Sequence, residues 1–330
     1  MTRPREARRQ LPPGLSCWRL ERHSCRPGGT IAAFQQLIAH QLKVEVRHHA
    51  TLAVGLAAGF SGSAGVRVVV PRAWRKGAAT LNPALTDSLR DGANLFFAAT
   101  QSVLGQTSRI TGHGIPVDQR PETFHAATPI APAFAIWAPL FISEALYAWR
   151  VASGGGTALD RDIGWLTAAA FAGNSAWEVQ AELRGFEWQS NAIILGAASA
   201  AVTAIIRAET GDYSEADKRR IRLPIGTLAG WLVLASAANA EASRIRMLGR
   251  PSPAREANEA IVLIAIASSA AASIAVATRG SGHFVAGAGW GLANIAVRNV
   301  REKRPHVAWA AVAGIGLALT GFAIGRRRAK

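Results

Sequence analysis

The chain has 330 residues, 49% of them hydrophobic, and 37 Lys and Arg against 21 Asp and Glu give a formal net charge of +16. Its mean hydropathy of +0.14 is modest for a membrane protein, because a basic first part is averaged with long apolar runs. The basic residues gather in that first part, in the joints between apolar runs and in the C-terminal RRRAK. This distribution argues against nucleic-acid binding and favours attraction to anionic lipid.

Residues 1–90 are predicted to form a basic and mostly disordered tail, because they contain too little continuous apolar surface to offset the entropy of ordering. An amphipathic helix is expected over 31–46, and glycines make 51–70 a poor membrane span. The two cysteines, Cys17 and Cys25, lack CxxC spacing, so no metal site is expected there.

Eight apolar stretches follow, each long enough to cross a hydrocarbon core of about 30 Å as a helix. They are Gly92–Ile110, Pro129–Trp149, Ile163–Glu182, Trp188–Arg207, Leu223–Ala242, Ala257–Thr278, His283–Val300 and His306–Gly325. The sequence therefore predicts an all-α, polytopic transmembrane bundle in the cell (inner) membrane. The distribution of Lys and Arg favours cytoplasmic termini only weakly.

Polar residues on the first span, Asn94, Gln101 and Gln106, are expected to face the interior of the bundle. The joint between the third and fourth spans is short, which predicts that these two helices are antiparallel neighbours.

Tryptophan is the most informative residue of the membrane part. Those at span ends, Trp149, Trp165, Trp188 and Trp309, fit an aromatic belt at the bilayer interfaces. Three others lie deeper and share helical faces with small or polar residues: Trp137 with Phe141 and Glu144, Trp177 with Asn174 and Glu178, and Trp231 with Ala235 and Asn239. Within a bilayer Glu144, Glu178 and Asn239 should face neighbouring helices, a partner or a wet cavity.

Catalytic signatures are absent, since no GxSxG, HExxH or Walker sequence occurs, so neither a catalytic residue nor a metal ligand is predicted. Small residues four apart, Ala169 with Gly173, Gly196 with Ala200 and Gly287 with Gly291, allow close helix approach. That spacing is equally typical of tight internal packing and of a dimer face.

The run FAIWAPLFISEALYAW resembles the second-helix signature of the TspO/MBR family (translocator protein, or tryptophan-rich sensory protein). The signature positions are Trp137, Leu140, Phe141, Ala145 and Trp149. The third-helix pattern matches Asn174 and Trp177, and the fifth-helix pattern matches Pro224, Trp231, Ala235 and Asn239. The resemblance implies a five-helix core over 91–243, and 244–330 is similar to the C-terminal membrane extension, of about three helices, in longer members.

Members of this family bind tetrapyrroles such as protoporphyrin, and other flat apolar ligands, in a pocket closed by the loop between the first two helices; they often dimerise. The resemblance thus implies transport or sensing of such a ligand, with no required cofactor. The pocket positions it implies are Trp137, Phe141, Asn174, Trp177, Trp231, Ala235 and Asn239.

Two departures from the family pattern bear on the ligand. Glu178 and Val179 stand where the family tends to have Ser-Pro, which puts a preference for anionic ligands in doubt, and the sterol-recognition pattern lacks its Tyr. Three other functions stay open. They are a proton-coupled transporter of a small solute, based on Glu144 and Glu178, a non-transporting membrane assembly protein, and an enzyme of porphyrin breakdown.

Overall fold

The computed structural model describes residues 83–329, and every described element of secondary structure is helical. The predictions for residues 1–82 of the tail, including the helix over 31–46 and the cysteines, lie outside these residues, whereas 83–90, also assigned to the disordered tail, belong to helix α2. The described elements are α2 (Pro83–Leu104), α3 (Thr107–Thr111), η2 (Val117–Gln119), η3 (Pro121–Thr123), η4 (Ala131–Ile136), α4 (Trp137–Arg150), η5 (Val151–Gly155), α5 (Ala158–Leu183), α6 (Trp188–Thr210), α7 (Glu215–Ile221), η6 (Arg222–Gly226), α8 (Thr227–Leu248), α9 (Pro253–Ala277), α10 (Gly282–Arg301) and α11 (Pro305–Arg328).

Seven of the eight predicted spans correspond to one helix or to a helix with its flanking turns, and the first, Gly92–Ile110, covers the end of α2 and most of α3. The first prediction was wrong in its start, because α2 begins at Pro83 rather than at Gly92. The prediction had assigned Arg90, as a charged residue, to the tail, so the predicted start of the first helix was too late. Its guanidinium is buried but pairs with Asp87 at 2.7 Å and with Asp91 at 2.8 Å, so the charge is compensated within the helix.

Local chemistry explains several helix boundaries. Thr157 and Asp160 form a capping box at the start of α5. Proline opens α9 and α11, at Pro253 and Pro305, where its missing N–H is harmless. Before α8, Pro224 lies in a π-helical turn, η6, that joins α7 to α8.

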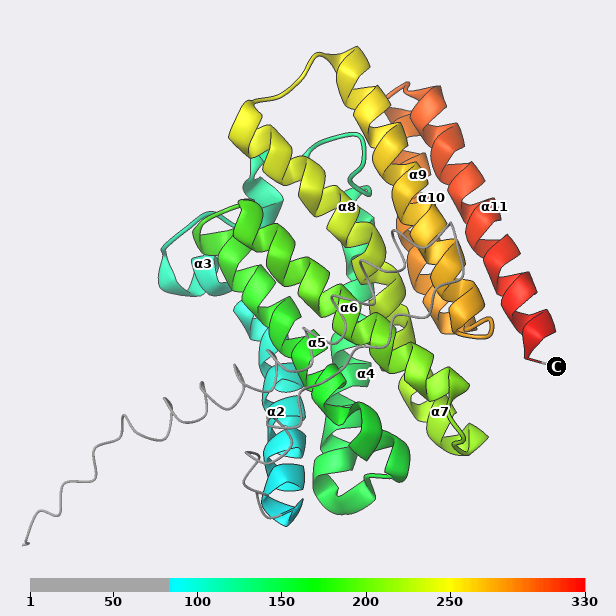
Figure 1. Cartoon of the computed structure of the whole chain (residues 1–330). Helices are drawn as coiled ribbons and strands as arrows, with labels where there is room; N and C mark the ends of the chain where they lie inside the picture. The colour runs from blue at the N-terminus through cyan, green and yellow to red at the C-terminus, as the bar shows by residue number, and fades with distance from the viewer. Residues whose placement is uncertain (1–82, 330) are drawn as a thin grey trace, which may run out of the picture. The chain divides into compact units, whose positions relative to one another are not determined.

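Consecutive long helices run antiparallel (Figure 1). One end of the bundle carries the 112–130, 184–187, 249–252 and 302–304 joints, and we call it the long-loop end; the other end carries the start of α2 and the C-terminus. As predicted, α5 and α6 pack against each other; α8 packs on α6, α9 and α10, and α11 packs on α9 and α10. The three C-terminal helices are therefore attached to the preceding helices mainly through α8, with smaller contacts from α10 to η4 and η6 and from α9 to α6.

Small residues line the closest helix contacts. A Cβ atom added to Gly173 on α5 would lie 2.9 Å from the Cβ of Ala197 on α6, and one added to Gly287 on α10 would overlap the backbone of Thr227 on α8. Internal packing therefore accounts for Gly173 and Gly287. Gly196 has no neighbour within 4 Å of such an atom, so its spacing with Ala200 does not come from a contact inside the described bundle.

Among residues 83–329, five helical segments are long and apolar enough to cross a membrane: Ala131–Gly155, Trp188–Thr210, Glu215–Leu248, Pro253–Ala277 and Pro305–Arg328. The helices at the other three predicted spans, α2, α5 and α10, are not among them. Between 28% and 56% of the apolar window in each is buried inside the protein, so much of their apolar surface faces outward. Large side chains such as Ile142, Leu146 and Ile266 are more than 60% exposed. Such a surface requires lipid around it, and we describe the chain as an integral, multi-pass membrane protein.

Candidate functional site

Four aromatic side chains from three elements meet in one cluster. The Trp137 and Phe141 rings on α4 are stacked, with centroids 5.2 Å apart and an interplanar angle of 18°. Trp231 on α8 meets Trp137 edge to face at 5.9 Å, and Phe134 on η4 meets Trp231 in the same manner at 5.7 Å. The predicted residues Trp137, Phe141 and Trp231 are thus brought together, on faces that the helical spacing had indicated. Phe134 was not singled out, although it lies one turn before Trp137.

The indole of Trp231 combines burial with an unused donor. It is 2% exposed, and its Nε1 has no hydrogen-bond partner among the described residues. A buried N–H group without an acceptor is destabilising by roughly 1–3 kcal/mol. The stacked pair on α4 is half-buried, so the aromatic cluster combines partly accessible ring faces with an unsatisfied donor.

Helix α10 is hydrogen-bonded to η4, which carries Phe134 of this cluster, and to the residue before η4. The Trp290 indole Nε1 donates to the carbonyl oxygen of Ala133 at 2.8 Å, and the Ile130 N–H donates to the carbonyl oxygen of Asn294 at 3.3 Å. Because Ala133 belongs to η4, the C-terminal extension fixes the turn that carries Phe134.

Trp177 and Asn239 belong to a second cluster. The Trp177 Nε1 donates to Asn239 Oδ1 at 2.7 Å, Ser190 Oγ donates to the same oxygen at 2.8 Å, and Asn239 Nδ2 donates to Asn191. These bonds join α5, α6 and α8. The Asn239 amide therefore hydrogen-bonds neighbouring helices, which is one of the environments expected for this residue. Ala235 is half-buried and lies one turn away on α8.

Asn174 belongs to a third cluster, deep between α2, α4 and α5. Its Nδ2 donates to Gln101 Oε1 at 3.1 Å and lies 3.5 Å from Glu178 Oε1, and Gln101 Nε2 donates to Glu144 Oε2. All four side chains are buried. The expectation that Glu144, Glu178, Gln101 and Asn94 face the interior is confirmed, but Gln106 is exposed and accepts from Arg109.

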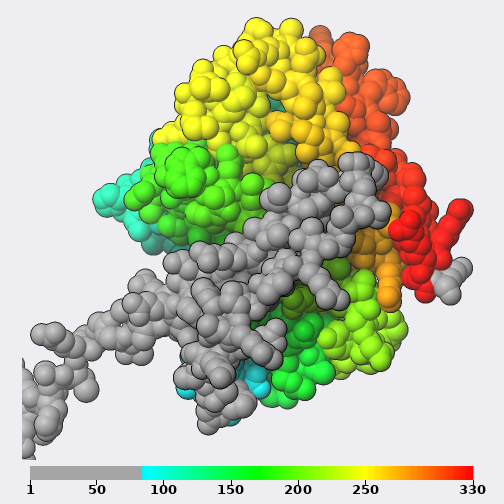
Figure 2. Space-filling model, viewed as in Figure 1, coloured from blue at the N-terminus to red at the C-terminus, as the bar shows by residue number. Residues whose placement is uncertain are grey.

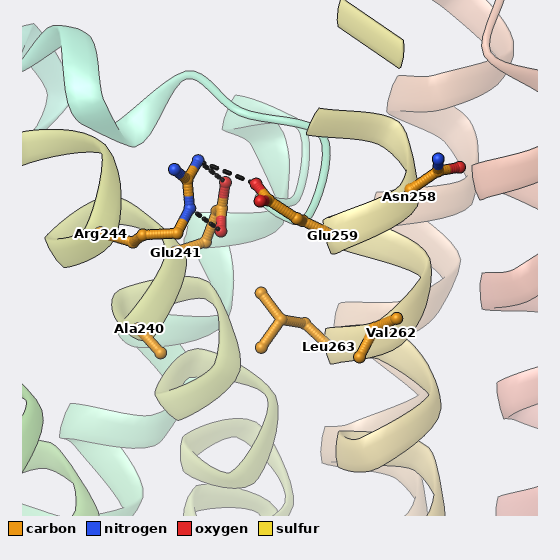
Figure 3. A pocket seen from close by; sticks show the side chains of 7 residues that line it. All are labelled: Ala240, Glu241, Arg244, Asn258, Glu259, Val262 and Leu263. Carbon is orange, nitrogen blue, oxygen red and sulfur yellow. Dashed lines mark hydrogen bonds and ion pairs between the residues drawn. The ribbon is translucent and has the colours of Figure 1, made fainter. Parts of the chain in front are cut away.

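Six of the seven predicted site residues thus fall into three clusters of contacts: Trp137, Phe141 and Trp231; Trp177 and Asn239; and Asn174. A groove of about 360 Å³ lies between α8 and α9, near the long-loop end (Figure 3). It is lined by Ala240, Glu241, Arg244, Asn258, Glu259, Val262 and Leu263, none of which the sequence had indicated. Arg244 pairs with Glu241 at 2.7 Å and with Glu259 at 3.0 Å across the groove. In the space-filling view α8 and α9 lie side by side on this face, with α11 along its edge (Figure 2).

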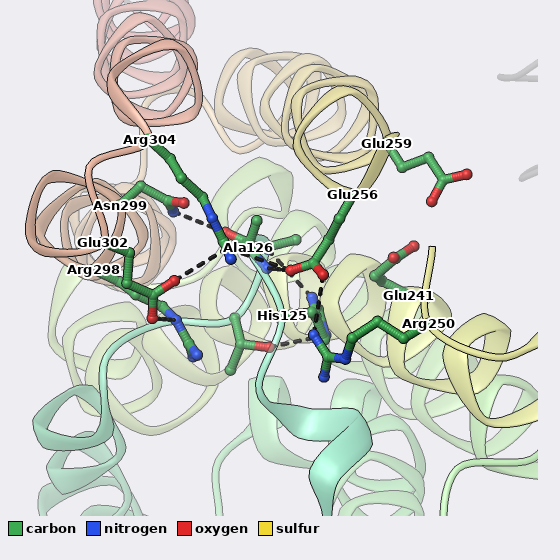
Figure 4. A network of polar contacts seen from close by, with 12 residues as sticks. His125, Ala126, Glu241, Arg250, Glu256, Glu259, Arg298, Asn299, Glu302 and Arg304 are labelled. Carbon is green, nitrogen blue, oxygen red and sulfur yellow. Dashed lines mark hydrogen bonds and ion pairs between the residues drawn. The ribbon is translucent and has the colours of Figure 1, made fainter. Parts of the chain in front are cut away.

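The 112–130 loop is fastened to the C-terminal helices by Glu256, a buried residue in the first turn of α9 (Figure 4). Its Oε1 accepts from the Ala126 N–H at 3.1 Å and pairs with Arg304 at 3.3 Å, and its Oε2 pairs with Arg250 at 3.0 Å. Asn299 on α10 adds a bond from its Nδ2 to the Ala126 carbonyl oxygen at 2.8 Å.

His125, on the same loop, is buried and neutral. Desolvation by burial, followed by the positive charge of Arg298, lowers the pKa of its imidazole to about 3. Its Nδ1 accepts from the Ala127 N–H at 3.2 Å, so the ring proton lies on Nε2, 2.9 Å from the Thr128 hydroxyl. The imidazole thus acts as a structural part of the loop.

Over residues 83–329 no group of three or more His, Cys, Asp or Glu side chains is arranged to hold a metal ion.

A family model described as TSPO-like protein matches residues 96–324 of the chain. No curated protein and no solved structure matches the chain.

Proposed function

The chain belongs to the TSPO-like protein family, and on that premise we propose that it binds a flat, apolar ligand of the tetrapyrrole type within the bilayer and acts in the transport or sensing of that ligand. The observation that carries this proposal is the aromatic cluster of Phe134, Trp137, Phe141 and Trp231, with its buried, unsatisfied indole N–H. The membrane we propose is the cell (inner) membrane.

The chemistry of the cluster suits such a ligand. Indole and phenyl faces stack on a conjugated ring, and the Trp231 Nε1 donor would satisfy an acceptor such as a propionate oxygen. Of the seven residues implied by the resemblance, Trp137, Phe141 and Trp231 would make the contact. Asn174, Trp177, Ala235 and Asn239 would shape the surrounding helices, since Trp177, Asn174 and Asn239 already use polar atoms in helix packing.

Entry of a ligand would require η4 to move, because Trp231 is only 2% exposed and Phe134 contacts its ring. The bonds from α10 to Ala133 and Ile130 would then oppose opening. The C-terminal extension would thereby tune access to the aromatic cluster.

The test is a titration of the purified full chain with protoporphyrin, followed by the shift of the porphyrin absorption band. Trp231→Phe keeps an aromatic ring, although a smaller one, and removes the N–H donor, so affinity should fall about fivefold to tenfold, the value of one hydrogen bond. Trp137→Ala removes the stacking face and should weaken binding further. Trp309→Phe, at an indole that is 70% exposed on α11, is the matched control. Unchanged affinity in both cluster variants would refute the proposal.

A further inference from the structure

The third cluster is a continuous chain of four buried side chains from three helices, and we call it the buried quartet: Gln101, Glu144, Asn174 and Glu178. Its order in space is Glu144 on α4, Gln101 on α2, Asn174 on α5 and Glu178 one turn further along α5. Gln101, Glu144 and Asn174 are 0% exposed and Glu178 is 7% exposed. The four residues are separated by up to 77 positions in sequence, so only the packing of the helices brings them together.

Three oxygens of the buried quartet lack a hydrogen-bond partner among the described residues: Glu144 Oε1, Asn174 Oδ1 and Glu178 Oε2. All three are acceptors. The amide nitrogens of the quartet already donate hydrogen bonds, since Gln101 Nε2 donates to Glu144 and Asn174 Nδ2 donates to Gln101 and Glu178. The site therefore lacks hydrogen-bond donors and positive charge, whereas it has unpaired acceptors.

Neither carboxyl group of the buried quartet has a cationic partner among the described side chains. The arginines on the adjoining helices are used elsewhere: Arg90 pairs with Asp87 and Asp91, and Arg150 pairs with Asp160. Helix α6 carries no charged residue from Trp188 to Ile206. Two ionised carboxylates close together in a bilayer, with no counter-charge, would be strongly unfavourable.

The packing around Glu178 decides what can supply the charge. A Cβ atom placed on Gly105 would lie 3.3 Å from both Cδ and Oε2 of Glu178, so the carboxyl group is in close contact with the chain at the end of α2. A proton needs no added volume, whereas an alkali cation with its ligand shell does.

We propose that the buried quartet is an intramembrane proton-binding site in which the Glu144 and Glu178 carboxyl groups retain at least one proton at neutral pH and exchange it with the long-loop end of the bundle. The adjoining residue on that path is Glu182, one turn beyond Glu178, which is 1% exposed and accepts from the Ser108 N–H at 2.6 Å. This site is independent of the aromatic cluster, and it supplies the element that proton-coupled transport requires.

Other charged groups lie on the elements packed around the quartet. Besides Arg90, Arg150 and Glu182 they include Arg109 and Asp118, paired at 2.8 Å near α3 and η2, Arg120 and Glu122, paired at 3.7 Å in the loop, and Arg222 of η6, paired with Glu209 at 2.7 Å. Each of these arginines has an acidic partner, and the side chains of Arg161 and Arg184, at the two ends of α5, are exposed, so none of the named arginines neutralises Glu144 or Glu178.

The experiment is infrared spectroscopy of the full chain in lipid vesicles at pH 7. We expect a carbonyl-stretch band of a protonated carboxylic acid that shifts in D₂O. It should weaken in Glu144→Gln and in Glu178→Gln and be lost in the double variant. Glu302→Gln, at a carboxylate about one-third exposed, is the control and should leave the band unchanged. A spectrum without this band, or a band unchanged in both single variants, would overturn the proposal.

A second measurement separates a proton from a metal ion and guards against misfolding. If the quartet held sodium or potassium, exchange of that ion for choline would shift the carboxylate bands, and this result would also overturn the proposal. Because Gln resembles a protonated Glu in shape, both single variants should keep the thermal midpoint of the unsubstituted chain at pH 7. At pH 9 the unsubstituted chain should lose thermal stability, and the double variant should lose less.

Discussion

Acidification should loosen the 112–130 loop through His125. In the folded loop the pKa of this imidazole is lowered to about 3, chiefly because burial disfavours the charged form and then because Arg298 repels it. When the loop opens, the imidazole returns to an ordinary pKa of about 6.5. A group whose folded pKa is depressed in this way takes up protons more readily in the open state, so the stability of the closed loop is full above pH 6.5 and is lost as the pH falls towards 3.

The magnitude follows from the two pKa values. Between pH 7 and pH 5 the open state gains protons while the closed imidazole stays neutral, so the free energy of opening falls by about 2 kcal/mol, or roughly 25-fold in the opening equilibrium. Hydrogen exchange of the amides at Ala126, Ala127 and Thr128, corrected for the intrinsic pH dependence of exchange, measures this equilibrium directly.

The control variants test whether His125 is the cause. His125→Gln should remove most of the 25-fold change, while His113→Gln, at an exposed imidazole of the same loop, should leave it in place. Protection that is equal at pH 7 and pH 5 in the unsubstituted chain would show that the imidazole is solvated or charged in the closed loop, and the reasoning from burial would be wrong.

Three further predictions concern packing and anchoring. Glu256→Ala leaves the buried Ala126 N–H without its acceptor, so the free energy of opening the 112–130 loop should fall by about 2 kcal/mol, measured as faster hydrogen exchange or proteolysis. The control Glu302→Ala should change this free energy little. Equal behaviour of the two variants would contradict the anchoring role of Glu256. Gly287→Ala forces α10 away from α8 and should destabilise the protein by roughly 1–3 kcal/mol in a thermal melt. Gly289→Ala, with no neighbouring atom within 4 Å, should be near neutral, and a reversed order would exclude the close approach. Asn239→Leu strands the Trp177 indole and the Ser190 hydroxyl and should be destabilising by about 2 kcal/mol or more, whereas the exposed Asn258→Leu should not; a neutral Asn239→Leu would mean that water replaces these bonds.

Much of the architecture was predictable because it is encoded locally. A run of apolar residues of bilayer length becomes a helix wherever it occurs, so Ala257–Thr278 and His306–Gly325 anticipate α9 and α11 to within four residues at each end. The start of α2 was misjudged because hydropathy counts Arg90 as charged, whereas Asp87 and Asp91 neutralise it inside the helix.

The candidate site was predictable only in part. Helical spacing correctly placed Trp137 and Phe141 on one face of α4 and indicated that Glu144 and Glu178 turn inward. The same spacing gave no means of deciding that Trp231 meets Trp137 while Asn239, two turns further on, is used by Trp177 and Ser190. Which faces meet depends on the rotation and register of each helix against its neighbours.

The sequence by itself determined that this protein is helical, that it lies in a membrane and that it belongs with the TSPO-like proteins, because apolar length and short motifs are properties of contiguous residues. The tertiary structure alone decided which buried polar groups find partners. It joins Glu256 to a loop 130 positions away and leaves Glu144 and Glu178 without a counter-charge. The physical reason is that hydrogen bonds and ion pairs act over a few ångströms, and only the packing of distant helices determines which atoms come within that range.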